Sequence, residues 1–182
     1  APYADSTLGN LIADAQLAYA RRRGPADVAF MNPGGIRADL TPEPGRAVTL
    51  GDLFAIQPFS NELVVMTLTG AQLRDLLQRQ LPKTDAPPRL LQVSGSLSYR
   101  WKLQDGQSVL GAVQIDGQPV DLGRSYRVVV NNFMAEGGDG HGTFKQGRDR
   151  VSLGMDIDAL SEWIGEQPQS VERIQSGRIV RE

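Results

Sequence analysis

The sequence contains no cysteine and only one histidine among its 182 residues. Without cysteine, the chain offers no disulfide, no zinc–thiolate site and no thiol nucleophile. Hydrolytic metal centres gather several histidine and carboxylate ligands, and His141 alone does not make one. No serine lies in a Gly-x-Ser-x-Gly elbow. We therefore expect no catalytic residue and no metal site in this chain.

Long apolar runs and an excess of one charge sign are also missing. No apolar stretch has the length of a membrane-spanning helix. Lys and Arg number 19 against 21 Asp and Glu, which gives a formal net charge of −2. This balance does not support a nucleic-acid or membrane-surface partner. Hydrophobic residues at 40% and charged residues at 22% fit an ordinary globular domain.

Hydrophobic spacing and turn residues predict one mixed α/β (α+β) domain over residues 1–182, a mixed sheet with flanking helices. A helix is expected to begin after Ser6 or Thr7 and to end before Gly24. Asp116-Gly117 is typical of a hairpin turn. The other predicted helices cover 52–55, 71–81 and 157–164, and the predicted strands cover 28–31, 63–68, 91–102, 109–115, 125–130 and 178–180.

The first loop with chemical potential runs from Asn32 to Arg37, directly after a buried strand. Ligands of open α/β sheets gather near the carboxyl ends of strands. Gly34 and Gly35 allow the backbone to approach a ligand closely, and the Arg37 guanidinium suits a phosphate or carboxylate. A tight turn with a structural Arg salt bridge explains the same pattern.

Two further loops each carry a phenylalanine. Phe59 follows Pro58 in a polar segment, where such a ring either plugs the core or offers a flat surface to a base. Phe133 lies beside a glycine-rich run in which Asp139 stands between two glycines. An Asp so placed either accepts hydrogen bonds from a vicinal diol or bonds its own backbone in a turn. The run lacks the Lys-Ser/Thr ending of a phosphate-binding loop.

Five segments stand out in a fixed order along the chain. They are Leu8-Gly9-Asn10-Leu11-Ile12-Ala13-Asp14-Ala15, Asn32-Pro33-Gly34-Gly35-Ile36-Arg37, Gln57-Pro58-Phe59-Ser60-Asn61, Leu91-Gln92-Val93-Ser94-Gly95 and Asn132-Phe133-Met134-Ala135-Glu136-Gly137-Gly138-Asp139-Gly140. In this order they resemble the C-terminal domain of the 5'-nucleotidase family, which includes UDP-sugar hydrolases and cyclic-nucleotide phosphodiesterases. Each motif is moderately specific, the five in order are strongly specific, and the resemblance spans nearly the whole chain.

The resemblance implies a nucleotide or nucleoside as ligand. Two aromatic rings of the family sandwich the base, and they correspond to Phe59 and Phe133. Arg37 matches the arginine that engages phosphate, and Asp139 matches the carboxylate that binds the ribose hydroxyls. Two asparagines match polar groups near the base and its sugar. The substrate-binding residues implied in this way are Asn32, Gly35, Arg37, Phe59, Asn61, Phe133 and Asp139.

Two departures from the family stand out. No arginine precedes the first helix at Pro2-Tyr3-Ala4-Asp5, where active members often carry one or two phosphate contacts. Pro87-Pro88-Arg89 replaces a glycine that lies close to the base in some members, and Pro88 has no N–H to donate. The phosphate and base contacts are therefore expected to differ from those of such members.

The family's two-metal centre lies in a separate N-terminal domain, which is absent from this chain. The resemblance therefore implies a parent hydrolase of phosphoester bonds in nucleotide catabolism, with two divalent metals in that partner domain and no cofactor here. It also implies closure by rotation, with the first helix and the residues before it as hinge. Turnover by this chain alone is not expected, and a periplasmic or extracellular location follows from the same resemblance.

Other functions stay open from the sequence. The domain could keep this fold as a non-catalytic interaction or structural module. A stacking site accepts a mononucleotide, a cyclic nucleotide, a dinucleotide or a UDP-sugar, and one branch of this architecture hydrolyses sulfur compounds. Retention of Phe59, Phe133 and Asp139 argues against the last, because sulfur compounds have no base to stack.

Overall fold

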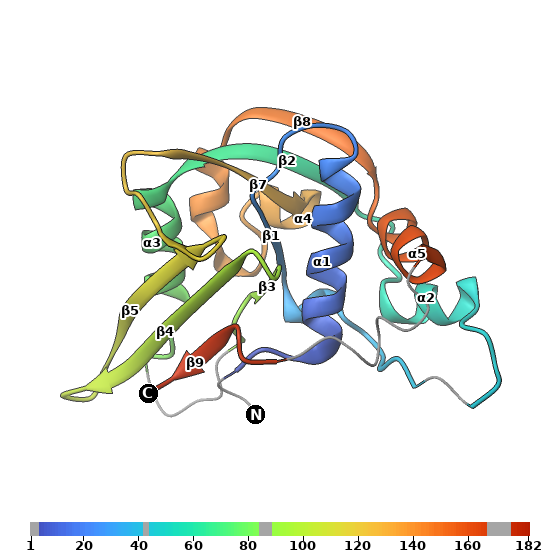
Figure 1. Cartoon of the computed structure of the whole chain (residues 1–182), viewed down its shortest axis with the longest axis horizontal. Helices are drawn as coiled ribbons and strands as arrows, with labels where there is room; N and C mark the ends of the chain where they lie inside the picture. Colours follow the sequence, from blue (N-terminus) through green and yellow to red (C-terminus); the bar gives the residue numbers. More distant parts are fainter. Residues whose placement is uncertain (1–3, 42–43, 84–88, 167–175) are drawn as a thin grey trace.

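The computed structural model of the chain describes residues 4–41, 44–83, 89–166 and 176–182, and it has the mixed α/β fold predicted from the sequence (Figure 1). Within these ranges, one sheet of five strands has the order β3-β1-β7-β2-β8. Its strands are β1 (Val28–Met31), β2 (Glu62–Thr69), β3 (Gln92–Val93), β7 (Ser125–Asn131) and β8 (Arg148–Met155).

A second sheet has the order β6-β5-β4-β9. It contains β4 (Leu97–Gln104), β5 (Gln107–Ile115), β6 (Gln118–Pro119) and β9 (Ile179–Arg181). The predicted hairpin turn at Asp116-Gly117 joins β5 to β6, and both residues have positive φ, as this type of turn requires.

The helices are α1 (Thr7–Arg21), α2 (Leu50–Ile56), α3 (Gly70–Gln80), α4 (Asn132–Ala135) and α5 (Asp156–Glu166). Short 3-10 turns cover η1 (Pro33–Gly35), η2 (Gly138–Gly140) and η3 (Gly142–Gln146). The α1 helix begins where the sequence predicts it, because the Ser6 side chain accepts a hydrogen bond from the Gly9 N–H. The α3 helix begins with a capping box made by Thr69 and Gln72.

The β1 strand of the first sheet is buried on both faces. Alternate residues of β1 enter different clusters: Val28 and Phe30 pack toward α3 and the second sheet, whereas Ala29 and Met31 pack toward the other face. Figure 1 shows α1, α2 and α5 on that other face. A strand covered on both sides is apolar at every position, which explains the continuous apolar run of β1.

The structure differs from the sequence prediction at two places in the sheets. The strand expected over 91–102 is broken in two, because Ser94 forms a turn with Leu97 while its hydroxyl accepts from the Ala29 N–H. The chain thereby leaves the first sheet and enters the second. The strand β8 was not predicted, because it lies at the sheet edge and residues 148–152 are exposed. Its polar sequence, Arg-Asp-Arg-Val-Ser, gives no clear apolar alternation.

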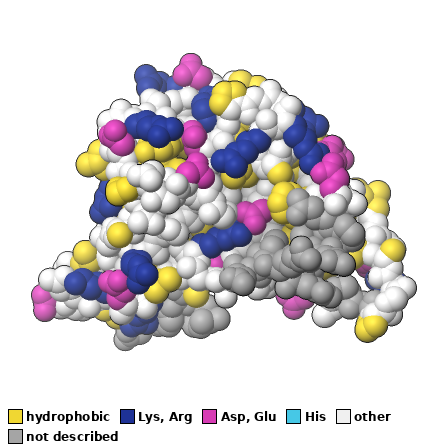
Figure 2. All heavy atoms as spheres, in the orientation of Figure 1, with side chains coloured by type: hydrophobic (Ala, Val, Ile, Leu, Met, Phe, Trp, Pro, Cys, Tyr) yellow, Lys and Arg dark blue, Asp and Glu magenta, His cyan; other side chains and the backbone are white. Residues whose placement is uncertain are grey.

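The outer surface carries mixed charge. On the face that Figure 2 shows, Lys and Arg side chains are interspersed with Asp and Glu rather than gathered by sign. No helix within the described ranges has both the length and the apolar character needed to span a membrane.

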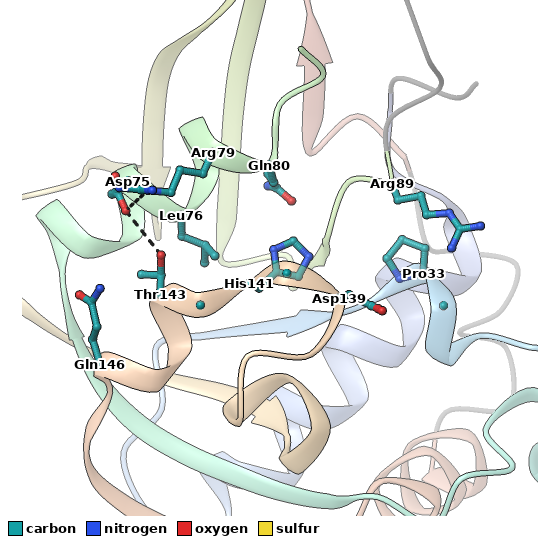
Figure 3. Close-up of a pocket in the computed structure, with 13 residues that line it drawn as sticks. Pro33, Asp75, Leu76, Arg79, Gln80, Arg89, Asp139, His141, Thr143 and Gln146 are labelled. Carbon is teal, nitrogen blue, oxygen red and sulfur yellow. Dashed lines mark hydrogen bonds and ion pairs between the residues drawn. The ribbon is translucent and has the colours of Figure 1, made fainter. Parts of the chain in front are cut away.

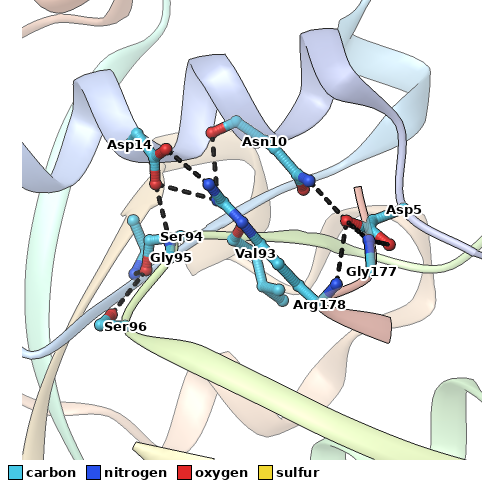
Figure 4. A network of polar contacts seen from close by, with 10 residues as sticks. Asp5, Asn10, Asp14, Val93, Ser94, Gly95, Ser96, Gly177 and Arg178 are labelled. Carbon is cyan, nitrogen blue, oxygen red and sulfur yellow. Dashed lines mark hydrogen bonds and ion pairs between the residues drawn. The ribbon is translucent and has the colours of Figure 1, made fainter. Parts of the chain in front are cut away.

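A polar network ties the segment before α1 to β9 (Figure 4). The Asp5 carboxylate accepts hydrogen bonds from the backbone N–H groups of Gly177, Arg178 and Ile179. The Arg178 guanidinium forms an ion pair with Asp14 at 2.7 Å and also donates to the Val93 carbonyl at 2.7 Å. Both charged side chains are mostly buried, with exposures of 16% and 17%. The network joins α1, the β3–β4 turn and β9.

Arg178→Ala is expected to lower the free energy of unfolding by about 2–4 kcal/mol. The Asp14 carboxylate loses its ion-pair partner and keeps the Gly95 N–H as a donor, while the Val93 carbonyl loses the guanidinium donor. Urea unfolding measures the change. Arg100→Ala is the matched control: its ion pair with Glu182 is exposed on both sides, at 58% and 49%, so its loss should stay below about 1 kcal/mol. Equal losses in the two variants would contradict this role of Arg178.

Candidate functional site

The pairing of three strands brings three loops to one edge of the sheet. β1 runs parallel to β7, with Val28 opposite Val128. β2 runs antiparallel to β7, with Leu63 opposite Asn131. The carboxyl ends of β1 and β7 and the amino end of β2 therefore meet at the same edge. The loops that leave it contain residues 32–37, 132–140 and 57–61, which are the three segments singled out in the sequence.

A line of amide and carboxylate groups connects two of these loops. The Asn131 amide donates to Asn32 Oδ1 at 3.0 Å, and Asn32 Nδ2 donates to the Asp139 carboxylate at 2.8 Å. Asn131 and Asn32 are buried, whereas Asp139 is exposed. Asp139 thus accepts a bond from a residue 107 positions away in the chain. Its remaining acceptor positions face solvent at a fixed place beside η1.

The two glycines of the first loop leave little room for a side chain. A Cβ atom at Gly34 would lie 3.3 Å from the Asp139 carboxylate, and one at Gly35 would lie 2.6 Å from Met31 Cε. Gly35 is buried. The absence of side chains at these two glycines therefore lets η1 lie close to the side chains of Asp139 and Met31, over the end of β1.

Phe59 and Arg37 lie together on the outside of the loops. The Arg37 guanidinium carbon is 5.9 Å from the centre of the Phe59 ring, which is 53% exposed. Arg37 is exposed, and its guanidinium donates one hydrogen bond, to the Gly34 carbonyl at 3.5 Å. It makes no ion pair with any residue in the described ranges, so the structural salt bridge considered from the sequence is absent there. Its guanidinium is available to an anion.

Phe133 is also an exposed ring, at 47%. It packs flat against Gly138, where a Cβ atom would lie 2.5 Å from a ring carbon. Neither Phe59 nor Phe133 plugs the core, unlike Phe30 and Phe144, which are fully buried with ring centres 5.7 Å apart. Glycine at position 138 therefore sets where the Phe133 ring lies, next to Asp139.

The Phe59 loop is fixed to the elements around it. The Glu62 N–H donates to the Asn132 side chain at 3.1 Å, which joins this loop to the segment that carries Phe133. The Asp156 N–H donates to the Asn61 carbonyl at 2.9 Å. Burial raises the pKa of the Asp156 carboxyl to about 6, and hydrogen bonding by Ile157 and Asn61 opposes this rise.

Sequence reasoning missed three residues that hold this arrangement. Asn131, Gly138 and Asp156 position the candidate residues without having been selected. The Asn-Asn pair that ends β7 was the available signal for Asn131, since its side chain caps α4 by accepting from the Met134 N–H. Within residues 4–41, 44–83, 89–166 and 176–182, no three His, Asp or Glu side chains are grouped to hold a metal ion.

Known proteins match most of the chain. The family described as 5'-nucleotidase, C-terminal domain, matches residues 1–146. Lmo0130, a cell wall protein of Listeria monocytogenes, is 34% identical over 171 residues, which are 90% of this chain and 21% of that protein. UshA of Escherichia coli is 31% identical over 166 residues, which are 89% of this chain and 28% of UshA.

The fold also matches a solved structure. The 5'-nucleotidase precursor from Thermus thermophilus superimposes with a TM-score of 0.77 and 33% identity, over 99% of this chain and 36% of that chain. The present chain thus spans between 21% and 36% of the length of these three proteins.

Asp156→Asn is expected to change how stability depends on pH. The pKa of Asp156 is raised from 3.8 to about 6 in the folded chain. The folded state therefore holds an extra proton between these values, and the stability that this proton provides near pH 4 is lost as the pH rises through about 6. The variant lacks this titration. Relative to the wild type, its free energy of unfolding should rise by about 2–3 kcal/mol from about pH 4 to about pH 7.

Guanidinium unfolding of both proteins at several pH values measures this difference. Taking the difference between the two proteins cancels the titration of groups that they share. A difference that stays constant across the range would contradict the raised pKa.

Proposed function

The chain belongs to the 5'-nucleotidase C-terminal domain family, and on this premise we propose that it is the nucleotide-recognition domain of a phosphoester hydrolase. The observation that carries the proposal is the convergence of three loops at one sheet edge. They present two exposed phenylalanine rings, a carboxylate held by an amide, and an arginine without an ion pair among the described residues. Each of these groups suits one part of a nucleotide.

The base is proposed to bind between Phe59 and Phe133. Both rings are about half exposed, so a ligand can cover them without displacing the core. Stacking of a base on an aromatic ring contributes about 1–3 kcal/mol and tolerates different bases. Two rings from distant parts of the chain therefore provide affinity with little selectivity among bases. Asn61 lies two residues after Phe59 and is proposed to contact the base or its sugar.

The ribose is proposed to bind the Asp139 carboxylate through its two hydroxyl groups. Asn32 already donates one hydrogen bond to Asp139, at 2.8 Å, which fixes the carboxylate before the ligand arrives. A charged acceptor strengthens such bonds. The phosphate is proposed to lie against Arg37, whose planar guanidinium can hold two phosphate oxygens at once.

Hydrolysis is proposed to need a separate domain of the parent protein. The described residues do not gather the ligands of a two-metal centre, so the two divalent metals would be held by the N-terminal domain, where they would activate water. This chain would supply binding energy and orientation, which lower the barrier by holding the phosphate in place. By itself it would turn over no substrate. In this reading the parent acts in nucleotide catabolism, in the periplasm or outside the cell.

A non-catalytic module with the same fold is the competing function. It would leave the two exposed rings without a ligand, and nucleosides would not raise the melting temperature of the chain. A sulfur compound as substrate would not use Phe59 and Phe133 as a stacking pair. The two rings together with Asp139 favour a nucleotide as the ligand.

Phe59→Leu and Phe133→Leu are each expected to weaken adenosine binding by about 5- to 150-fold, because each removes one stacking surface. Isothermal titration calorimetry measures the dissociation constants. Phe54→Leu is the matched control, since Phe54 is another exposed phenylalanine, at 42%, on α2. Unchanged binding in the double variant of Phe59 and Phe133 would rule out the stacking site.

Asp139→Asn is expected to weaken adenosine binding by about 10- to 100-fold, because hydrogen bonds to a charged group contribute about 1.5–3 kcal/mol. Binding of 2′,3′-dideoxyadenosine, which lacks both hydroxyls, should not change. Competition binding with the two nucleosides gives the comparison. Asp149→Asn is a close control, since Asp149 is also an exposed aspartate with positive φ, at 50° against 57° for Asp139. An equal loss for both nucleosides would contradict the ribose contact.

A further inference from the structure

A cavity of about 570 Å³ lies beside the candidate site, between α3 and the segment that follows Asp139 (Figure 3). This volume is in the range of small-molecule sites. Pro33, Gly34 and Asp139 form one end of the cavity and also belong to the loops of the candidate site. The rest of its wall comes from α3, Arg89 and residues 140–146, which the proposed nucleotide site does not use.

The two acidic side chains of the cavity already have partners. Asp75 accepts from Arg79 Nε at 2.6 Å and lies 3.5 Å from the Thr143 hydroxyl. Asp139 accepts from the Asn32 amide at 2.8 Å. A cationic ligand would compete with bonds that the chain itself makes, so the cavity is poorly suited to one.

Two side chains of the cavity that can carry a positive charge have no bonding partner among the described residues. The Arg89 guanidinium and the His141 imidazole make no hydrogen bond or ion pair with any residue that the structure describes. Figure 3 shows the imidazole in the middle of the cavity and Arg89 at the end near Pro33. The ring of His141 meets Phe144 edge-on, with centres 6.3 Å apart, which holds its plane.

Protonation of His141 decides the charge of the cavity. Burial lowers the pKa of the imidazole, and the nearby Asp139 carboxylate opposes this effect. While His141 is neutral, Arg79 and Arg89 balance Asp75 and Asp139. Protonation adds one positive charge in the middle of the cavity, and a bound anion would favour that form.

We propose that this cavity is an anion subsite that binds a phosphate or sulfate monoester through Arg89 and His141. The guanidinium offers two parallel donors to the anion, and the imidazolium offers a third. A Cβ atom at Gly140 or Gly142 would meet nothing within 4 Å, so the loop around His141 leaves open space. Because protonated His141 supplies part of the charge, the anion binds more tightly at low pH.

Two sources of the monoester share this chemistry. A free monoester occupies the cavity alone. A monoester on the 2′ or 3′ oxygen of a bound nucleoside reaches the cavity past Asp139, and this second source rests on the proposed function. The anion subsite itself does not.

The single histidine of the chain makes the test direct. The imidazole resonances of His141 can be followed by NMR against pH, with and without sodium sulfate at constant ionic strength. Sulfate keeps both charges over the titration range. Sulfate binding is expected to raise the pH at which His141 is half protonated by about one unit. This shift should reach a plateau as the sulfate concentration increases.

Arg89→Gln should abolish this shift. Arg74→Gln is the matched control, because it removes the same charge from a residue on α3 that does not line the cavity. In the wild-type chain the Arg74 guanidinium donates to the Gly111 carbonyl at 3.2 Å. The Arg74→Gln variant should retain the full shift. A His141 midpoint that sulfate does not move in the wild-type chain, or that moves equally in Arg89→Gln, overturns the proposal.

Titration with 3′-AMP and 2′-AMP distinguishes the two sources. If the ribose carries the monoester, one of these nucleotides acts at a concentration at least about tenfold below that of sulfate, and Phe133→Ala removes the advantage. If the two nucleotides and sulfate shift the His141 titration at equal concentrations, the cavity binds a free monoester. Failure of adenosine to bind would overturn the nucleotide site and leave the sulfate result standing, whereas failure of sulfate would overturn only the anion subsite.

Discussion

The pairing of β7 with two neighbours of opposite direction is the constraint on which the site depends. β1 lies parallel to β7 on one side, and β2 lies antiparallel on the other. This arrangement places the ends of three strands at one edge of the sheet, although the loops that carry residues 32, 59 and 133 are far apart in sequence. Most of the three strands is apolar and buried, so their register is strongly fixed. The geometry of the loops follows from that of the core beneath them.

Much of the fold was predictable because its signals are local. The N-cap of α1, the leucines of α3 and the turn at Asp116-Gly117 each act through neighbouring residues. The break at Ser94 was not predictable, because it depends on a hydrogen bond to Ala29, 65 positions away. β8 was not predicted for a related reason. Its position depends on pairing with β2, while its own polar sequence is typical of a loop.

The candidate site divides in the same way. The residues whose side chains face solvent, such as Phe59, Phe133 and Asp139, were selected through a resemblance of motifs. Those that hold them were not, because their effect is tertiary: Asn131 acts through Asn32, and Gly138 acts by lacking a side chain beneath a ring. The interpretation of Arg37 as a structural ion-pair partner also needed coordinates to decide. Exposure and unused bonding capacity are properties of the fold, and no spacing in the sequence encodes them.

The attachment of Asp5 to β9 has a mechanical consequence. Its carboxylate is bonded to three successive backbone N–H groups, and Arg178 locks the same strand to α1. Bending within α1 would have to break these bonds. A rotation of the domain that leaves them intact would therefore move α1, β9 and the β3–β4 turn as one rigid unit. The loops at the sheet edge would then travel without being reshaped.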